Sequence, residues 1–153
     1  WNCDASGAYS GENQPALGIN TTGLDYLRGY QVTGNEGTVT FDTVLPGWYP
    51  GRTPHLHFMV RPPTPAGHHG TWFASQLYFE EGTLDDVYAQ PPYRGRANRT
   101  NAEDFIYQQP LEDGTPSGQP LTLELARASA KGSAYQSALG IVLAEESFRT
   151  LRG

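Results

Sequence analysis

Cysteine, lysine and long apolar stretches are scarce in this sequence, and each shortage excludes a class of protein. Cys3 is the one cysteine among 153 residues, so no internal disulfide framework can hold the fold together. Its thiol is either buried or bonded to a cysteine outside this sequence. The formal net charge of -6 comes without a basic cluster, so we expect neither nucleic acid nor an anionic membrane surface as a partner. No apolar stretch approaches the roughly 18 residues that a membrane span requires.

Glycine, proline and tyrosine are abundant by contrast. The chain has 18 glycines, 12 prolines and nine tyrosines, a composition that indicates short strands joined by many turns. We therefore predict an all-β fold, a β-sandwich in which loops at one end build the functional site. The length suits a single domain over residues 1–153. Because the first residues read as the end of a strand, we expect the beginning of that strand to lie upstream.

Turn signals divide the chain into short elements. The expected strands cover residues 26–33, 38–44, 55–60, 72–79, 121–126 and 141–144. Residues 34–37 supply the positive φ of a hairpin turn between the first two strands. The expected helical segments are residues 83–89, behind a threonine cap, and 101–104, and the expected loops are residues 5–23, 61–70, 93–119 and 128–138. We expect His68 and His69 to be solvated.

The most informative stretch is residues 47–58, which contains two histidines in the alternating pattern of a strand. A strand's period of two places His55 and His57 on one face, about 6.6 Å apart along the chain. Two imidazoles on one face can bind one metal ion. Taken alone, the pair is equally consistent with solvated histidines on a half-exposed strand.

Two histidines leave a metal ion under-coordinated, so further ligands must come from neighbouring loops. Tyr9, Tyr49, Asp4 and Arg52 lie in or near such loops. A phenolate is a hard anionic donor with a free pKa of about 10, and only a strongly Lewis-acidic ion such as ferric iron holds it deprotonated at neutral pH. Two tyrosines with two histidines would therefore indicate Fe(III). On the residues alone, Tyr9 is more often an ordinary loop residue and Tyr49 a packed aromatic.

Four separated motifs occur in a definite order along the chain. They are WNCDASGAY at residues 1–9, GWYP at 47–50, RTPHLHF at 52–58 and SQLYF at 75–79. In content and order these motifs resemble those of the intradiol ring-cleavage dioxygenases, and the chain looks closest to the extracellular branch of that family. The similarity extends from residue 1 to about residue 105, and the remainder matches only as generic sandwich strands.

The resemblance implies one Fe(III) per chain, held by Tyr9, Tyr49, His55 and His57 with a solvent hydroxide as fifth ligand. It also implies an immunoglobulin-like or prealbumin-like β-sandwich. The implied activity uses O2 to cleave a catechol-type ring between its two hydroxyl-bearing carbons, which gives a muconate-type diacid. The expected partners are a small-molecule catechol and O2.

The same resemblance assigns roles to residues around the iron. Tyr49 would leave the metal and act as a base when the substrate binds. Arg52 would stabilise negative charge that develops on the substrate, and Gln76 would orient Arg52 or the substrate. The residues expected to line the substrate pocket are Trp48, Asp4 and Gly7.

Two other functions remain consistent with the residues. A non-catalytic sandwich module would display Trp1, Trp48 and Trp72 as a platform for sugars or lignin fragments, and it would be colourless and free of iron. Zinc on His55 and His57 would suit hydrolysis, although zinc sites usually add cysteine, histidine or carboxylate ligands.

Two glycosylation sequons, at Asn20 and Asn98, fit a secreted protein. The pattern is short and also arises by chance. We expect an extracellular protein that acts as a monomer.

Overall fold

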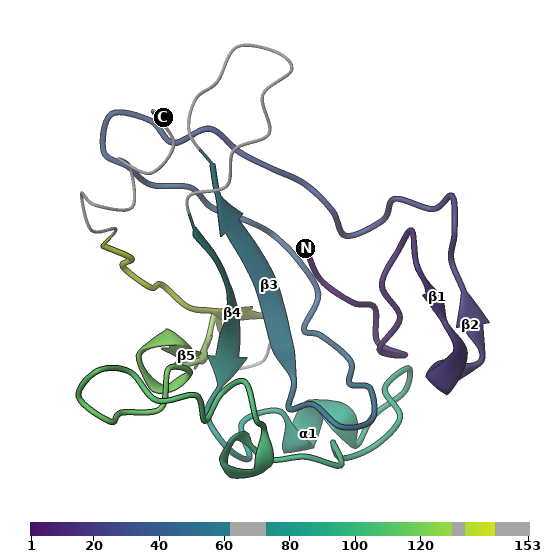
Figure 1. Ribbon diagram of the computed structural model, residues 1–153. Coiled ribbons are helices and arrows are strands. Elements are labelled where there is room, and N and C mark those ends of the chain that lie inside the picture. The colour runs from purple at the N-terminus through teal and green to yellow at the C-terminus, as the bar shows by residue number, and fades with distance from the viewer. Residues whose placement is uncertain (62–72, 130–133, 143–153) are drawn as a thin grey trace, which may run out of the picture.

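The computed structural model describes residues 1–61, 73–129 and 134–142. Its regular elements are mostly strands with little helix, which confirms the all-β class predicted from the composition. Figure 1 shows the two long strands β3 and β4 side by side, with helix α1 near one end of them. The strands are β1 (Asn13–Gln14), β2 (Ile19–Asn20), β3 (His55–Val60), β4 (Phe73–Phe79), β5 (Thr122–Leu123), β6 (Ala126–Arg127) and β7 (Tyr135–Gln136).

The helical segments of the described residues are all short. They are α1 (Asp85–Tyr88) and three single 3-10 turns, at Pro15–Leu17, Asn101–Glu103 and Gln119–Leu121. The helix predicted over residues 83–89 is confirmed in shorter form, but Leu84 stands at its N-cap and no side chain caps it, so the predicted threonine cap is wrong. The turn predicted over residues 101–104 is confirmed. None of these helices is long and apolar enough to cross a membrane.

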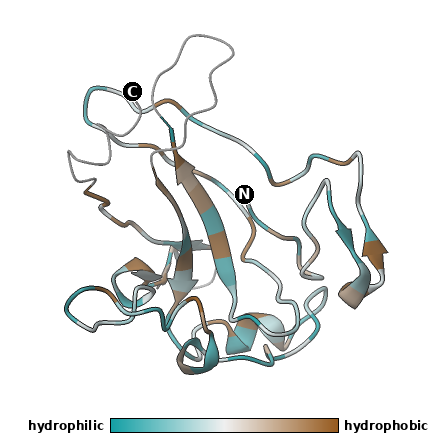
Figure 2. Cartoon of the chain, in the orientation of Figure 1, coloured by the Kyte–Doolittle hydropathy of each residue, from teal (hydrophilic) through white to brown (hydrophobic). Residues whose placement is uncertain are grey.

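The pairing of β3 with β4 sets the geometry of the site. The two strands are antiparallel, with His55 opposite Tyr78 and His57 opposite Gln76. Directly opposed residues of an antiparallel pair share one face of the sheet, so these four side chains lie on the same side. Figure 2 shows hydrophilic and hydrophobic residues alternating along β3. The end of β4 pairs in parallel with β5 on its other edge.

A small hydrophobic core lies where β4, β5 and α1 meet. Its buried members are Phe79, Leu84, Tyr88 and Leu123. The hydroxyl of Tyr88 donates a hydrogen bond of 2.8 Å to the carbonyl oxygen of Pro46. The core is therefore tied to the loop that leads to Tyr49.

The hairpin predicted over residues 26–44 is right in its turn and wrong in its strands. Gly37 has a positive φ of 69° and its N–H donates to the carbonyl oxygen of Gly34, which closes the expected turn. The two arms form no ladder of hydrogen bonds, Leu27 has a positive φ of 55°, and Figure 1 draws the arms without arrows. Tyr30 and Val32 are 89% and 81% exposed. Strand propensity in these arms is local, whereas a sheet also needs a partner layer against its apolar face.

The other predicted strands have mixed outcomes. Strands 55–60 and 72–79 are confirmed as β3 and β4, with Trp72 itself outside the described residues. The strand predicted at 121–126 is two short pieces, β5 and the start of β6. Residues 141 and 142 form no strand, which corrects the start of the strand predicted at 141–144, and residues 143 and 144 lie outside the described ranges.

Two segments expected to be irregular contain short strand pairs. β1 and β2 pair within the loop predicted at residues 5–23. β7 lies in the predicted link at residues 128–138 and pairs with β6. Two-residue strands carry almost no periodic signal, so only tertiary pairing reveals them. His68 and His69 lie outside the described residues.

Candidate metal centre

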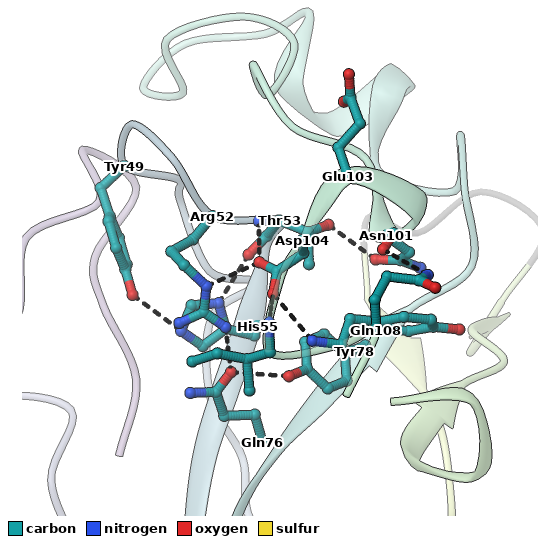
Figure 3. A network of polar contacts seen from close by, with 12 residues as sticks. Tyr49, Arg52, Thr53, His55, Gln76, Tyr78, Asn101, Glu103, Asp104 and Gln108 are labelled. Atoms are coloured by element: carbon teal, nitrogen blue, oxygen red, sulfur yellow. Dashed lines mark hydrogen bonds and ion pairs between the residues drawn. The ribbon is translucent and has the colours of Figure 1, made fainter. Parts of the chain in front are cut away.

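The four predicted metal ligands converge at the start of β3. The hydroxyl oxygens of Tyr49 and Tyr9 lie 3.1 and 3.5 Å from Nε2 of His55. Nε2 of His57 lies 3.2 Å from the same nitrogen. Donor atoms that each lie about 2.0–2.1 Å from one ion are about 3 Å apart, so these separations suit a shared metal ion. Figure 3 shows the hydroxyl of Tyr49 directed at the ring of His55.

The ring of His55 is held in the tautomer that a metal ligand requires. Its Nδ1 lies 2.7 Å from the carbonyl oxygen of Thr53. A carbonyl oxygen only accepts, so Nδ1 carries the proton and Nε2 presents its lone pair to the other ligands. His55 is 2% exposed, and burial is the main cause that lowers its pKa to about 3 and the pKa of His57 to about 4. Both imidazoles are therefore neutral at pH 7.

Both tyrosines are protonated when no cation is bound. Tyr9 is 4% exposed and Tyr49 is half-buried. Burial, the largest effect in each case, raises the pKa of both phenols above the ordinary value, and the nearby positive charge of Arg52 offsets only part of this rise. A strongly Lewis-acidic ion would be needed to hold either residue as a phenolate.

The chemistry of these four donors fits a hard trivalent cation. The single lone pair on Nε2 of His55 has three polar neighbours within 3.5 Å. One lone pair accepts one good hydrogen bond, so these three contacts cannot all be hydrogen bonds to it. A shared cation satisfies all four donors together. Two phenols and two neutral imidazoles suit Fe(III), because a phenolate is a hard anionic ligand.

A zinc site on His55 and His57 would need further ligands of the usual residue types. Within residues 1–61, 73–129 and 134–142, no group of three or more histidine, cysteine, aspartate or glutamate side chains could hold a metal ion. Structural and catalytic zinc sites draw their ligands from these residue types. The further donor atoms beside His55 and His57 are instead the two tyrosine hydroxyls.

Two glycines allow the two tyrosine-bearing loops to cross. A Cβ at Gly7, whose φ is +83°, would lie 2.1 Å from the carbonyl oxygen of Trp48, and a Cβ at Gly47 would lie 2.5 Å from the carbonyl oxygen of Asp4. The N–H of Gly47 donates to that same Asp4 oxygen at 3.0 Å. Such close backbone approach requires glycine. It brings the two tyrosine rings edge to face, with centroids 5.9 Å apart.

Side chains within the first loop hold Tyr9 in place. The carboxylate of Asp4, predicted to line the pocket, accepts the N–H groups of Ser6 and Ala8 at 2.8 and 3.1 Å. Gln14 Oε1 accepts the N–H of Tyr9 at 2.7 Å. Asp4 therefore shapes the loop that presents Tyr9, and its contact with a substrate stays a prediction.

Trp48 and Trp1 are half-buried, and each has one face of its ring covered. Nε1 of Trp48 donates to the carbonyl oxygen of Gly95 at 2.7 Å, and the guanidinium of Arg94 lies 5.1 Å from its ring centre. Trp1 stacks on His57 with centroids 4.9 Å apart and an interplanar angle of 6°. The stacking partner of His57 was not predicted from the sequence. These contacts leave less indole surface for the sugar-binding platform, whose third member, Trp72, lies outside the described residues.

Arg52 and Gln76, predicted to act on the substrate, lie beside the ligands in a buried polar network (Figure 3). They are 9% and 8% exposed. Nη2 of Arg52 donates to Oε1 of Gln76 at 2.5 Å, and the hydroxyl of Tyr78 donates to the same oxygen at 2.9 Å. The amide of Gln76 is thus held from two sides.

Asp104 is the important residue that the sequence did not reveal. Its Oδ2 lies 2.8 Å from Nε of Arg52, and the residue is fully buried. Burial by itself would raise the pKa of Asp104, but hydrogen bonds from Arg52, Tyr107 and Thr53 outweigh it and lower that pKa. Burial likewise lowers the pKa of Arg52, and Asp104 outweighs this and raises it above its ordinary value. The pair is therefore charged, but nothing local in the sequence connects residues 52 positions apart.

Two solved structures are similar to this chain. One is a crystal structure of a dioxygenase, with 30% sequence identity and a TM-score of 0.61 over 82% of this chain and 60% of that chain. The other is an intradiol ring-cleavage dioxygenase from Tetranychus urticae, with 30% identity and a TM-score of 0.69 over 91% of this chain and 66% of that chain. The chain thus spans no more than two thirds of either structure. No family model and no curated protein matches the sequence.

The fold and the site together define an all-β protein with a candidate metal centre of two tyrosines and two histidines. Among such proteins, the chain belongs to the intradiol ring-cleavage dioxygenases, a family of oxidoreductases. This confirms the family that the four sequence motifs predicted.

Proposed function

We propose that this protein is a non-haem Fe(III) dioxygenase that cleaves catechol-type rings between the two hydroxyl-bearing carbons. One observation carries the proposal: the hydroxyls of both tyrosines and Nε2 of His57 gather within 3.5 Å of Nε2 of His55. The reaction adds both atoms of one O2 to one catechol and yields a muconate-type diacid, so no other oxidant or reductant is needed. Membership of the family supports this class of reaction.

One Fe(III) per chain would be held by Tyr9, Tyr49, His55 and His57. Two phenolates and one hydroxide would balance three positive charges, and two neutral imidazoles complete the shell without adding charge. When bound, the ion supplies a Lewis acid that holds the catechol as a dianion and makes its ring reactive toward O2. The neutral state of both imidazoles, a consequence of their burial, supports this ligand set.

Tyr49 is suited to accept a proton from the substrate. It is half-buried and precedes Gly51, an exposed residue with a φ of +92°, whereas Tyr9 is 4% exposed and its backbone is fixed by Gln14. As the catechol binds, the phenolate oxygen of Tyr49 would take the proton of one catechol hydroxyl, and the solvent hydroxide would take the proton of the other. Tyr9 stays in place because its loop is fastened.

Arg52 would stabilise negative charge that develops on the substrate. Its guanidinium is a permanent cation, and it lies in a nearly dry environment where such a charge acts strongly. The oxygen of Gln76 is occupied by Arg52 and Tyr78, so its amide N–H2 is the end available to a substrate oxygen. Gln76 would therefore orient Arg52 and the substrate together.

We further propose that the strands belong to an immunoglobulin-like or prealbumin-like β-sandwich with the centre at its loop end. Support comes from the proposed ligands, since Tyr9 and Tyr49 lie on loops and His55 begins β3.

We also propose a secreted monomer that acts on small-molecule catechols. The exposure of Asn20 and Asn98, the two sequon asparagines, supports secretion.

The test is metal analysis of the purified protein, a visible spectrum, and anaerobic addition of catechol. We expect about one iron per chain, a red-brown colour from tyrosinate-to-iron charge transfer, and a shift of that band when catechol binds. Admission of O2 should then yield a diacid that carries both oxygen atoms from labelled O2. A chelator should remove the colour and the activity, and added Fe(III) should restore both.

The control is the His55→Ala variant, which should be colourless and inactive. Absence of iron from the wild type, with no spectral change on adding catechols, would overturn the proposal. A colourless wild type that still binds aromatic compounds would instead favour the non-catalytic binding module.

A further inference from the structure

The buried carboxylate of Asp104 joins two distant parts of the chain. Its Oδ2 accepts hydrogen bonds of 2.8 Å from Nε of Arg52 and 2.8 Å from the N–H of Thr53. Its Oδ1 accepts the N–H groups of Ile106 and Tyr107 at 2.9 and 3.0 Å. The carboxylate is thus fastened to its own loop on one side and to the segment before β3 on the other.

The contact with Asp104 determines how the guanidinium of Arg52 is placed. Asp104 binds the Nε edge, Gln76 binds Nη2 at 2.5 Å, and the ring of Phe105 lies 5.5 Å from the guanidinium carbon. Two hydrogen bonds from different nitrogens fix the orientation of a planar group. The remaining N–H groups are then directed by Asp104 and Gln76 rather than by the flexible stem of Arg52.

Through Thr53, Asp104 also influences the orientation of the His55 ring. Thr53 donates its N–H to Asp104 and its hydroxyl to Oδ1 of Asn101 at 2.8 Å, and Asn101 in turn donates to the carbonyl oxygen of Phe79. The carbonyl oxygen of Thr53 accepts the Nδ1–H of His55. The residue that sets the tautomer of His55 is therefore itself held by the loop of Asp104.

We infer that Asp104 is a positioning residue of the centre, one that orients the Arg52 guanidinium and, through Thr53, the ring of His55. This inference rests on the proposed function for its catalytic meaning, but the positioning itself is a property of the protein chain. It assigns a role to the segment after β4, outside the motifs that hold the four ligands. In this role Asp104 acts through Arg52 and Thr53, which donate hydrogen bonds to its carboxylate directly.

A carboxylate of this length is the group that the position requires. Asparagine would offer one oxygen in place of two and would direct an N–H2 group at donors. Glutamate keeps the charge that pairs Arg52, but it moves the carboxylate by one methylene, so the hydrogen bonds to Thr53 and Arg52 cannot both keep their geometry. The two substitutions therefore separate loss of charge from loss of position.

The test compares Asp104→Glu and Asp104→Asn with the wild type and with Asp113→Asn. Asp113 is a matched control because its carboxylate also accepts a backbone N–H, from Thr115, in an exposed turn outside the network. Nitrogen-15 NMR of the metal-free full chain reports the Nε–H signal of Arg52 and the tautomer of His55. Kinetics of the iron-loaded proteins separate kcat from KM.

We expect the Arg52 signal to move or exchange faster in Asp104→Glu, and His55 to sample both tautomers. In the iron-loaded protein kcat should fall by about 100-fold, as for a group misplaced by about 1 Å, with a smaller change in KM. Asp113→Asn should match the wild type in every measurement. Asp104→Asn is expected to be less stable, because it leaves a buried charge without its partner.

Wild-type NMR signals and wild-type kcat in folded Asp104→Glu would overturn the inference. It would also be overturned if the variant were less stable yet had unchanged signals and kcat below its melting temperature, since the role would then be structural only. If the wild type neither binds iron nor cleaves catechols, the proposed function fails, and the NMR comparison still decides whether Asp104 positions Arg52 and His55.

Discussion

The hydroxyl oxygen of Tyr49 lies 3.1 Å from Nε2 of His55, six residues further along the chain. The segment between them bends through Gly51, which has a φ of +92°, before His55 begins β3. A side chain on a bent loop has more conformational freedom than a side chain on a paired strand, although these two meet at one point. This difference underlies the distinct roles proposed for the tyrosine and the histidine.

Replacing either tyrosine by phenylalanine should have different consequences. Tyr49→Phe should keep its iron but bind catechol at least about tenfold more slowly, because it lacks the base that takes the substrate proton. Tyr9→Phe should hold iron more weakly, since it removes an anionic ligand that the loop cannot replace. Stopped-flow absorbance after anaerobic mixing measures the first effect, and iron content measures the second.

Tyr30→Phe is the control for the tyrosine variants, because Tyr30 is 89% exposed and is not one of the four proposed ligands. It should behave as the wild type. Normal turnover by Tyr49→Phe would show that Tyr49 is not the departing base.

Removal of the His55 imidazole should abolish iron binding. His55 is the buried donor around which the other three gather, and its Nδ1–H is already bound to Thr53. In His55→Ala we expect iron content near zero after purification, measured by elemental analysis. His69→Ala should retain full iron, as predicted from the sequence for a solvated histidine. Full iron content in His55→Ala would contradict the proposed ligand set.

A methyl group at Gly7 should separate the two tyrosine-bearing loops. A Cβ there would lie 2.1 Å from the carbonyl oxygen of Trp48, and the φ of +83° is also unfavourable for alanine. We expect Gly7→Ala to lower the free energy of unfolding by about 3 kcal/mol, from strain and overpacking together. Urea unfolding followed by tryptophan fluorescence measures the loss.

Gly18→Ala separates the two causes of that loss. Gly18 has a φ of +67° but no atom within 4 Å of the added Cβ, so this variant should lose only about 1 kcal/mol from backbone strain. Equal losses in the two variants would show that the crossing of the loops is not close-packed in solution.

Lowering the pH should destabilise the metal-free protein. Burial holds the folded pKa of His55 at about 3 and that of His57 at about 4, whereas an unfolded histidine titrates near 6.5. Below about pH 6.5 the unfolded state takes up protons that the folded state does not, so the free energy of unfolding falls as the pH drops toward about 4. The slope should reach at most about 1.4 kcal/mol per pH unit for each histidine.

Chemical unfolding at a series of pH values measures this slope. His57→Gln should remove about half of it, because one of the two buried imidazoles is gone. A slope that stays unchanged in His57→Gln would contradict the burial of a neutral His57. The low pKa of Asp104 adds a second loss at still lower pH, below its ordinary value of 3.8.

Local patterns in the sequence were sufficient for the elements that depend on neighbouring residues. The alternation at residues 55–60 predicted the strand and the shared face of His55 and His57, because side chains alternate in any strand. The glycines at 34 and 37 predicted a turn that is present. The arms beside that turn were predicted as strands and are not, since pairing depends on what packs against them.

The sequence by itself determined the family, and with it the two tyrosines and two histidines that we propose as ligands, because these are contained in short separated motifs. Only the tertiary structure decided that Tyr9 and Tyr49 meet around His55, that Trp1 stacks on His57, and that Asp104 holds Arg52. The physical reason is separation along the chain. The close approach of the loops, where Gly7 meets Trp48, and the ion pair between Arg52 and Asp104 each join residues more than 40 positions apart. Such contacts form only when the whole chain is packed.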